Sequence, residues 1–427
     1  MISRITASEC FVYITLPGET EFVTVGKFEL TTNRQGIPTG KFVYGKSYLK
    51  RDNAVPIDPF ALKLSNKTYE TNLLKGVFGA LRDGSPDYWG RRVIEKHVGK
   101  TELGEIDYLL HSPDDRAGAL GFGLNREPPA PRRKFNQTIE LERLQALAEI
   151  IIADEELPEG TEAEQAQNLV NGGTSMGGAR PKAVVEDDNA LWVAKFHHPE
   201  DKWNDARVEH AMLMLAGECG LQSAESKVVT IGEYDALLVK RFDRENTKAG
   251  YRRGRMLSAL TLLRADENYQ NRDNWSYVLL VEELRRVSSQ PRTDAPELFR
   301  RMCFNALISN VDDHPRNHAV VAMNTDWKLS PAYDLTPSMP ISIERRDLAL
   351  ECGDMGRYAH ADNLLSQSAR FLLEPDAAKN EIDTIEEIVK SKWYDIARRE
   401  GVTEKDCEKI ASAFAYPGFR LKISAMP

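Results

Sequence analysis

The sequence predicts an α+β protein with a β-rich N-terminal region, a mixed middle region and a mostly helical C-terminal region. Residues 9–50 alternate apolar and polar positions with Gly and Pro between them, which is typical of short antiparallel strands. Two further hairpins are expected at 182–196 and 227–242, each with turn residues between two apolar runs. After them, apolar residues recur at helical spacing. The 427 residues suffice for two or three domains.

The predicted division has three parts, which cover residues 1–137, 138–243 and 244–427. In the first part the apolar spacing becomes helical over residues 73–98, after the strands. The stretch 125–137 is rich in Pro and Arg and has no periodicity, which indicates a linker or a domain edge. Thr138 then can cap a helix whose apolar face carries residues such as Leu141.

Two longer helices are expected further along the chain. One runs from about Asp205 to Cys219, with a stripe that is apolar every three or four residues and with Gly220 at its C′ position. The other runs from about Pro296 to Asn310. It is expected to be capped by Asp294, with Glu297 three residues further on.

The composition restricts the function classes. Lys and Arg number 56 against 65 Asp and Glu, and the net charge of -9 does not suit a chain that coats nucleic acid unaided. The five cysteines are scattered without a C-x-x-C pair, which favours a reducing compartment over a disulfide framework. The first residues lack the apolar core of a signal peptide and no apolar run is long enough to span a membrane, so we expect a cytoplasmic protein.

A glycine-rich stretch, NGGTSMGGARPK, occupies residues 171–182 and precedes an expected strand. Glycines such as Gly177 and Gly178 permit the close backbone approach by which N–H groups hold a phosphate. The spacing matches neither the Walker pattern nor G-x-G-x-x-G. On spacing alone, a phosphate loop and a pliable surface turn are equally good interpretations.

The stretch ISNVDDHPRNHAVV, residues 308–321, is more specific. Pro315 forbids helix continuation, so the residues around it form a loop before a strand. Asp312 and Asn317 have the spacing of a phosphotransferase catalytic loop, in which the Asp accepts the proton of the attacking hydroxyl and the Asn binds Mg2+. Asp313 fits this spacing less well, and a zinc site at His314 and His318 lacks a third ligand nearby.

Other parts of a kinase occur in the expected order. Asp334, in SPAYDLTPS at an expected strand end, can bind a metal held by ATP phosphates. Lys195 follows the glycine loop at the end of a strand, where it can reach the α- and β-phosphates, and Glu209 on the next helix could orient it by an ion pair. Each residue alone also fits a turn or an exposed position, but their joint order favours phosphoryl transfer.

Taken together, the motifs of this sequence resemble those of the HipA serine/threonine kinases, which are the toxins of bacterial toxin–antitoxin pairs. The resemblance rests on GGTSMGGARPKAVV, WVAKF, NVDDHPRNHAV and LSPAYDLTPS, and on FGALRDGSPDYWGRR and IDYLLHSPDDRAGALGFG near the N-terminus. It covers nearly the whole chain. It implies a two-lobed protein-kinase-like domain, with a mostly helical C-terminal lobe, behind a β-rich N-terminal domain, and ATP between the lobes.

The resemblance also implies roles for single residues. Asp312 would be the catalytic base, Asn317 and Asp334 would bind Mg2+, and Lys195 would contact ATP. Further nucleotide contacts would come from the glycine loop with Gly177 and Gly178, from the hinge around Lys240 and Phe242, and from Lys182 as a charge near the phosphates. Ser175 would be the self-phosphorylated serine, whose added dianion would repel the nucleotide.

The implied partners are a HipB-like helix-turn-helix antitoxin on a separate chain and a translation-related protein substrate, such as an aminoacyl-tRNA synthetase. Operator DNA would be reached only through the antitoxin. Two basic clusters, Arg132-Arg133-Lys134 and Arg252-Arg253-Arg255, are the candidate DNA-facing surfaces, although such clusters are more often solvated faces. A small-molecule kinase and a largely non-catalytic corepressor remain alternatives.

Overall fold

The structure, a computed structural model, describes residues 8–101, 103–112, 116–131, 135–155, 180–339 and 342–422. The chain forms two compact units. The first consists of Met1–His198, Lys240–Leu257 and Val321–Trp327, and the second of Pro199–Val239, Ser258–Val320 and Lys328–Pro427. The predicted α+β class is confirmed, since mostly antiparallel sheets combine with helices that gather in the C-terminal half of the chain. The division into three domains remains a prediction.

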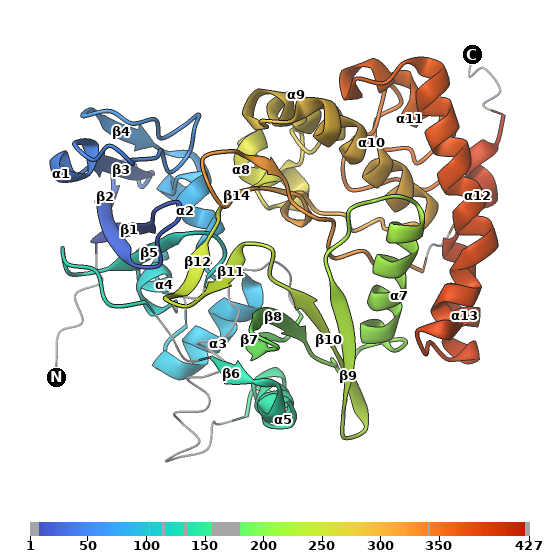
Figure 1. The fold of residues 1–427 in the computed structure, drawn as a ribbon, viewed down its shortest axis with the longest axis horizontal. Helices are drawn as coiled ribbons and strands as arrows, with labels where there is room; N and C mark the ends of the chain where they lie inside the picture. Colours follow the sequence, from blue (N-terminus) through green and yellow to red (C-terminus); the bar gives the residue numbers. More distant parts are fainter. Residues whose placement is uncertain are drawn as a thin grey trace. The chain divides into compact units, whose positions relative to one another are not determined.

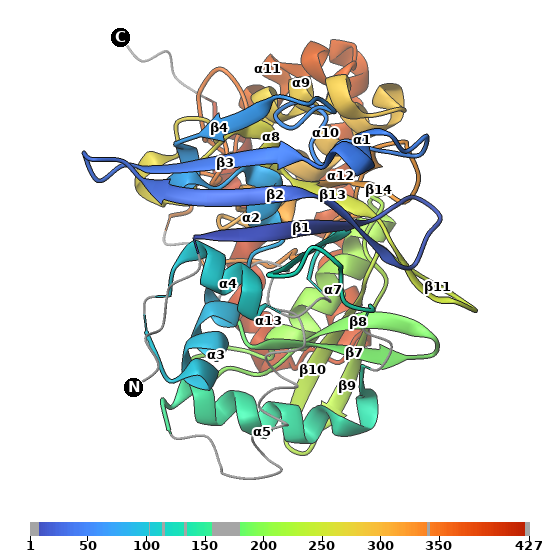
Figure 2. The same cartoon turned by 90° about the vertical axis from the view of Figure 1, so that its left-hand side faces the viewer.

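The first unit opens with an antiparallel sheet in the order β4-β3-β2-β1-β5. Figure 2 shows β1, β2, β3 and β4 side by side. The alternation in the sequence places Val12 and Ile14 of β1, and Phe28 of β2, in the core. The predicted strands in residues 9–50 are confirmed as β1 Glu9–Thr15, β2 Phe22–Thr32 and β3 Pro38–Tyr44, whereas Lys46–Leu49 at the end of that range forms a short helix. The sheet is completed by β4 Thr68–Thr71 and β5 Leu120–Gly123, which were not predicted.

The helical spacing over residues 73–98 yields several short helices and not one long helix. Gly84 and Pro86 interrupt it, and Asp87 then caps a new helix by accepting a hydrogen bond from Gly90 N at 2.8 Å. That helix ends at Gly99, which has a left-handed φ of 67°. The helical segments here are α1 Lys46–Leu49, η1 Leu73–Gly76, α2 Gly79–Asp83, α3 Tyr88–Val98 and α4 Glu105–His111.

Thr138 lies one residue too far along the chain for the cap that we expected. Gln137 N donates a hydrogen bond to the Glu140 carboxylate, Thr138 begins a 3-10 turn, and the Thr138 hydroxyl instead donates to Asp187. The helix that follows has the predicted apolar face, with Leu141 buried. The elements are β6 Asn136–Gln137, η2 Thr138–Glu140 and α5 Leu141–Ile152.

The first predicted hairpin is confirmed as β7 (Lys182–Asp187) and β8 (Ala190–Lys195), which pair from Lys182↔Lys195 to Asp187↔Ala190. Its two turn residues, Asp188 and Asn189, both have positive φ, as a tight two-residue turn requires. Further along the chain, β11 (Arg244–Thr247) pairs with β12 (Gly250–Arg253), and β13 covers Arg255–Ser258.

The second unit begins with α7 (Asp205–Glu218), which confirms the predicted helix, its buried stripe and Gly220 with a φ of 78°. The hairpin of β9 (Ser226–Ile231) and β10 (Tyr234–Lys240) is also confirmed. Figure 1 shows the long α12 alongside α7 and α10. The remaining elements are α8 Ala259–Leu263, η3 Tyr269–Asn271, α9 Tyr277–Val287, α10 Pro291–Leu307, η4 Pro315–Asn317, β14 Ala319–Ala322, β15 Lys328–Leu329, α11 Ala361–Ser366, η5 Ser368–Phe371, α12 Pro375–Arg399, α13 Glu404–Ile410, η6 Ala411–Ala413 and η7 Pro417–Arg420.

The start of α10 was predicted wrongly. The helix begins at Pro291, five residues before Pro296, and Asp294 lies within its first turns and not at its cap. Pro291 occupies the first helical position, where the missing N–H costs nothing. The buried Asp294 carboxylate accepts hydrogen bonds from Ser288, Gln290 and Leu329.

None of the helices in the described ranges combines the length and the apolar composition that a membrane span requires.

Candidate active site

The loop after α10 carries the predicted catalytic residues of the second unit. The loop is present as expected, but α10 already ends at Leu307, eight residues before Pro315, and a single 3-10 turn, η4, covers Pro315–Asn317. At the start of the loop, the buried Asn310 donates its amide to Asn305 Oδ1 at 3.1 Å and to the backbone oxygen of Asp334 at 3.4 Å. The end of α10 therefore fixes both this loop and the segment that carries Asp334.

The two adjacent aspartates have different environments. Asp313 is 1% exposed, and its Oδ2 atom accepts hydrogen bonds from the Tyr277 hydroxyl and from His318 Nε2, the latter at 2.9 Å. Asp312 is exposed, and its Oδ1 atom accepts a hydrogen bond from the Tyr269 hydroxyl. A base for an incoming hydroxyl must be within its reach. The geometry therefore favours Asp312 as the base and Asp313 as a buried anchor of the loop.

His314 is a structural residue of the loop. Its Nδ1 accepts a hydrogen bond from Arg316 N at 3.0 Å, and its Nε2 faces the backbone oxygen of Glu267 at 3.4 Å. Burial lowers the pKa of His314 from 6.5 to about 4, although the carboxylates of Asp312, Asp313 and Asp334 oppose this shift. His314 is therefore neutral near pH 7. Because both ring nitrogens have partners, the geometry does not favour the zinc alternative.

Asp334 lies beside the loop, although it is not at the end of a regular strand as expected. The nearest strand, β15, ends at Leu329. Asp334 has a φ of 59°, which is unusual for a residue with a side chain and recurs at functional sites. Next to it, the Tyr333 hydroxyl donates to the backbone oxygen of Arg316 at 2.6 Å. With the bond from Asn310 to Asp334, this contact brings the two predicted segments together.

Asn317 and Asp334 fit a magnesium ion by their chemistry. An amide oxygen and a carboxylate are hard donors, and Mg2+ is commonly held by one or two carboxylates together with substrate phosphates. Within the described ranges, no group of three or more His, Cys, Asp or Glu side chains could hold a metal ion by itself.

The predicted nucleotide contacts lie mostly in the first unit. Lys195 is half-buried at the end of β8, as expected, and Glu209 of the second unit is buried on α7. Their ion pair stays a prediction. Lys240 lies over the Trp192 ring at 5.8 Å, and Phe242 is half-buried. Ser175, Gly177 and Gly178 lie outside the described residues.

Lys182 has a structural environment that the sequence did not indicate. Its ammonium group forms an ion pair with Asp87 at 2.7 Å, and the two side chains are 1% and 3% exposed. The backbone oxygen of Lys182 accepts a hydrogen bond from Trp89 Nε1 at 3.2 Å. Strand β7 is thereby tied to the N-terminus of α3, and a contact between Lys182 and phosphate stays a prediction.

A buried charge network fixes the predicted hinge, and sequence reasoning missed it. Asp243 is fully buried and accepts hydrogen bonds from Arg241, from Arg244 and from Gly118 N. Burial alone would raise the pKa of Asp243, but the charges of Arg241 and Arg244 hold it below its ordinary value. Both arginines also donate to the backbone oxygen of Arg116. The alternation of charges in KRFDRE, residues 240–245, was the available signal.

The second basic cluster is not a continuous surface. Arg253 and Arg255 are both buried and lie over the rings of Phe22 and Trp327. Arg252 is partly exposed and faces Glu245. The cluster therefore presents no triple positive charge to DNA. The other cluster, Arg132-Arg133-Lys134, lies outside the described residues.

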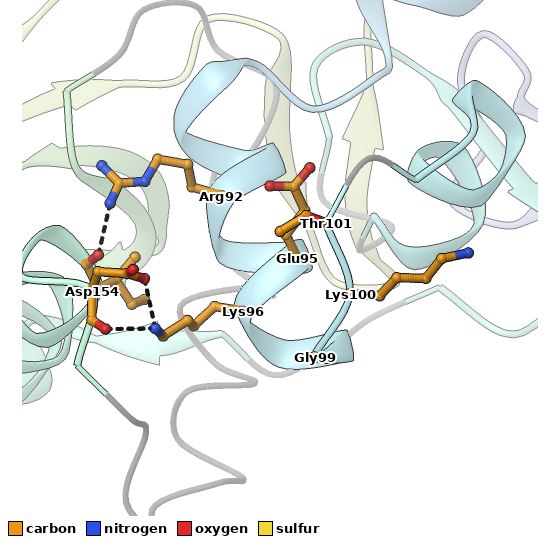
Figure 3. A pocket seen from close by; sticks show the side chains of 8 residues that line it. Arg92, Glu95, Lys96, Gly99, Lys100, Thr101 and Asp154 are labelled. Carbon is orange, nitrogen blue, oxygen red and sulfur yellow. Dashed lines mark hydrogen bonds and ion pairs between the residues drawn. The ribbon is translucent and has the colours of Figure 1, made fainter.

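A cavity of about 460 Å³ lies between α3 and the end of α5 in the first unit (Figure 3). Two of its basic side chains are already engaged: Arg92 donates to Ile151 O at 3.0 Å, and Lys96 donates to Asp154 O at 2.9 Å. These cations cap the C-terminal end of α5. The cavity is lined by Arg92, Glu95, Lys96, Gly99, Lys100, Thr101, Ile151 and Asp154, which include no predicted site residue.

Comparison with known proteins bears on the family and the fold of this chain. The family model of the HipA-like C-terminal domain matches residues 174–393. A protein of Sinorhizobium fredii described as a candidate kinase, Y4mE, is 25% identical over 340 residues, which cover 75% of this chain and 77% of that protein.

A solved structure shares the fold. HipA of Shewanella oneidensis, in its complex with HipB and operator DNA, superposes with a TM-score of 0.67 and 17% identity, over 94% of each chain. The α+β architecture is thus that of HipA, and a kinase is the function class that these likenesses support. The family model covers more than half of this chain, and the chain therefore belongs to the HipA family.

Proposed function

We propose that this chain is an ATP- and Mg2+-dependent serine/threonine protein kinase that acts as the toxin of a cytoplasmic toxin–antitoxin pair. The observation that carries the proposal is the arrangement of the loop after α10. There, Asp312 is exposed, Asp313 is buried, and hydrogen bonds hold the segment of Asp334 beside them. A phosphotransferase needs an accessible base next to a metal-binding carboxylate.

In the proposed reaction, Asp312 accepts the proton of the serine or threonine hydroxyl that attacks the γ-phosphate of ATP. Asn317 and Asp334 would hold Mg2+, which when bound neutralises charge on the phosphates. Lys195 would orient the α- and β-phosphates, with Glu209 as its partner. Asp313 keeps the loop in place, because its carboxylate is fixed by Tyr277 and His318.

The proposed partners rest on the similarity of this chain to the HipA proteins. The Shewanella structure contains HipB and operator DNA, so a HipB-like antitoxin on a separate chain is the partner that we propose here, and this chain would reach DNA through it. The protein substrate would be translation-related, such as an aminoacyl-tRNA synthetase. Self-phosphorylation would occur on Ser175.

The experiment is incubation of the purified chain with labelled ATP and Mg2+, followed by mass spectrometry. We expect phosphate on Ser175, and Asp312→Ala should abolish it. Asp273→Ala is the matched control, because Asp273 is also an exposed aspartate of the second unit. Labelling that survives in Asp312→Ala would contradict the assignment of the base.

A further inference from the structure

The exposed aspartate of the candidate active site receives a hydrogen bond from a tyrosine distant in the sequence. The hydroxyl of Tyr269 donates to Oδ1 of Asp312, 43 residues further along the chain. An ionised carboxylate has only acceptor atoms, so the phenol must be the donor. Burial and the bond to Asp312 both raise the pKa of Tyr269, which keeps its proton in place at neutral pH.

Tyr269 is held in position by a platform that belongs to the same loop. Its ring packs against Trp275 and His314, with ring centroids 4.8 Å and 5.9 Å away. Trp275 is fully buried, donates to the backbone oxygen of Asp266 at 2.9 Å, and lies 4.4 Å from His314. An ion pair between Arg316 and Glu267 adds a second link. These contacts attach the segment 266–275 to the catalytic loop, and Tyr269 stays 44% exposed within it.

The hydrogen bond from Tyr269 occupies Oδ1 of the Asp312 carboxylate and leaves Oδ2 for an incoming hydroxyl. A carboxylate offers about four lone-pair sites on two oxygens, so a hydrogen bond at Oδ1 still permits an incoming hydroxyl to donate at Oδ2. An exposed side chain otherwise samples several rotamers, and a charge-assisted hydrogen bond restricts this freedom. Productive proton transfer requires the base within hydrogen-bond reach in one orientation.

We propose that Tyr269 is a positioning residue for Asp312: its hydroxyl fixes Oδ1, so that Oδ2 points to the acceptor hydroxyl. The inference rests on the proposed kinase function. Tyr269 acts through Asp312, so its loss should lower the rate of the chemical step and leave nucleotide binding unchanged.

The neighbouring aspartate provides a contrast. Asp313 also receives a tyrosine hydroxyl, from Tyr277, but that tyrosine is fully buried and also accepts a hydrogen bond from Asn305 at 3.0 Å. Tyr277 therefore supports the fold. Tyr269 is 44% exposed, so removal of its hydroxyl should leave the fold intact.

The test compares single-oxygen deletions in the full chain. Tyr269→Phe should lower the maximal rate of self-phosphorylation about tenfold, because one hydrogen bond to a charged group is lost, with the half-saturating ATP concentration and the melting temperature unchanged. Tyr251→Phe is the matched control: it deletes a hydroxyl that donates to the Glu186 carboxylate at 2.6 Å in the first unit, and it should leave the rate unchanged. Tyr269→Ala also removes the ring, so comparison of the two variants separates the effect of the hydroxyl from the effect of ring packing.

Each outcome supports or contradicts the positioning role of Tyr269. An active wild type with Tyr269→Phe at full rate, or above it, would overturn the positioning role, and a loss seen only in Tyr269→Ala would assign the effect to ring packing. Phosphate found on Tyr269 itself would make it an acceptor and would also overturn the proposal. A wild-type chain that transfers no phosphate would overturn the proposed function, and this inference with it.

Discussion

The buried ion pair of Lys182 and Asp87 yields the sharpest test of the structural interpretation of the first unit. Two functions compete for Lys182: a charge near ATP phosphates, as the family resemblance implies, and a structural tie between β7 and α3. The ammonium and carboxylate groups are 2.7 Å apart and 1% and 3% exposed. Asp87 also caps α3 through its bond with Gly90 N. The structure therefore predicts a loss of stability when either side chain is removed.

The loss in the free energy of unfolding that we expect for Asp87→Ala has two parts. Removal of one partner from a buried ion pair costs about 3–5 kcal/mol, because the other charge stays in a poorly solvated place. Loss of a helix cap costs about 1 kcal/mol. Asp87→Ala should thus lower the free energy of unfolding by about 4–6 kcal/mol. For a unit of roughly 150–250 residues, this corresponds to a fall in melting temperature of about 10–20 °C.

Scanning calorimetry of the full chain measures the effect, and variants separate its parts. Asp87→Asn keeps an oxygen for Gly90 N, so it should lose the charge contribution and retain the cap. The double variant Asp87→Ala, Lys182→Met leaves neither charge of the pair buried and should recover much of the loss. The reasoning is refuted if Lys182→Met melts like the wild type but needs far more ATP for half-maximal rate.

Three further predictions concern the second unit and the hinge. Asp313→Asn should lower the free energy of unfolding by about 2–4 kcal/mol in urea titrations, whereas Asp312→Asn should leave it within about 0.5 kcal/mol, because one carboxylate is buried in a hydrogen-bond network and the other is exposed; equal losses would contradict this. Burial lowers the pKa of His210 below 6.5, so the unfolded chain binds the proton first and stability should fall as the pH drops below about 6.5. His210→Gln should flatten that slope, and an unchanged slope would refute the cause. Asp243→Asn should cost about 3–5 kcal/mol by calorimetry, since Arg241 would keep its buried charge without the carboxylate, and a loss below about 1 kcal/mol would count against the network.

The elements that the sequence predicted well have local causes. The turn at Asp188 and Asn189 and the stop of α7 before Gly220 are each encoded by a few adjacent residues. The start of α10 was wrong for an equally local reason, since either Pro291 or Pro296 could be the first helical residue. The burial of Asp294 and Ala295, which lie in the added N-terminal part of the helix, favours the longer helix, and spacing alone does not reveal it.

The candidate site shows a different limit. Spacing selected Asp312 and Asn317 as candidates and ranked Asp313 below Asp312, but it could not reveal that the Asp312 side chain is exposed and the Asp313 side chain is buried. Their difference depends on Tyr269 and Tyr277, more than thirty residues earlier, which the fold brings to the loop. Pairings over such distances in the chain leave no periodicity in the sequence. The ion pair of Lys182 was missed for the same reason, as its partner lies 95 residues away.

The central claim is that the carboxylates of Asp312 and Asp334 serve one site that handles a metal-bound nucleotide. Calorimetric titration of the full chain with ATP, with and without Mg2+, tests it most directly. We predict that Mg2+ tightens ATP binding at least about tenfold in the wild type and in Asp312→Asn, and that Asp334→Asn loses this effect while it melts like the wild type. Binding of ATP that responds to Mg2+ equally in the wild type and in Asp334→Asn would contradict the account.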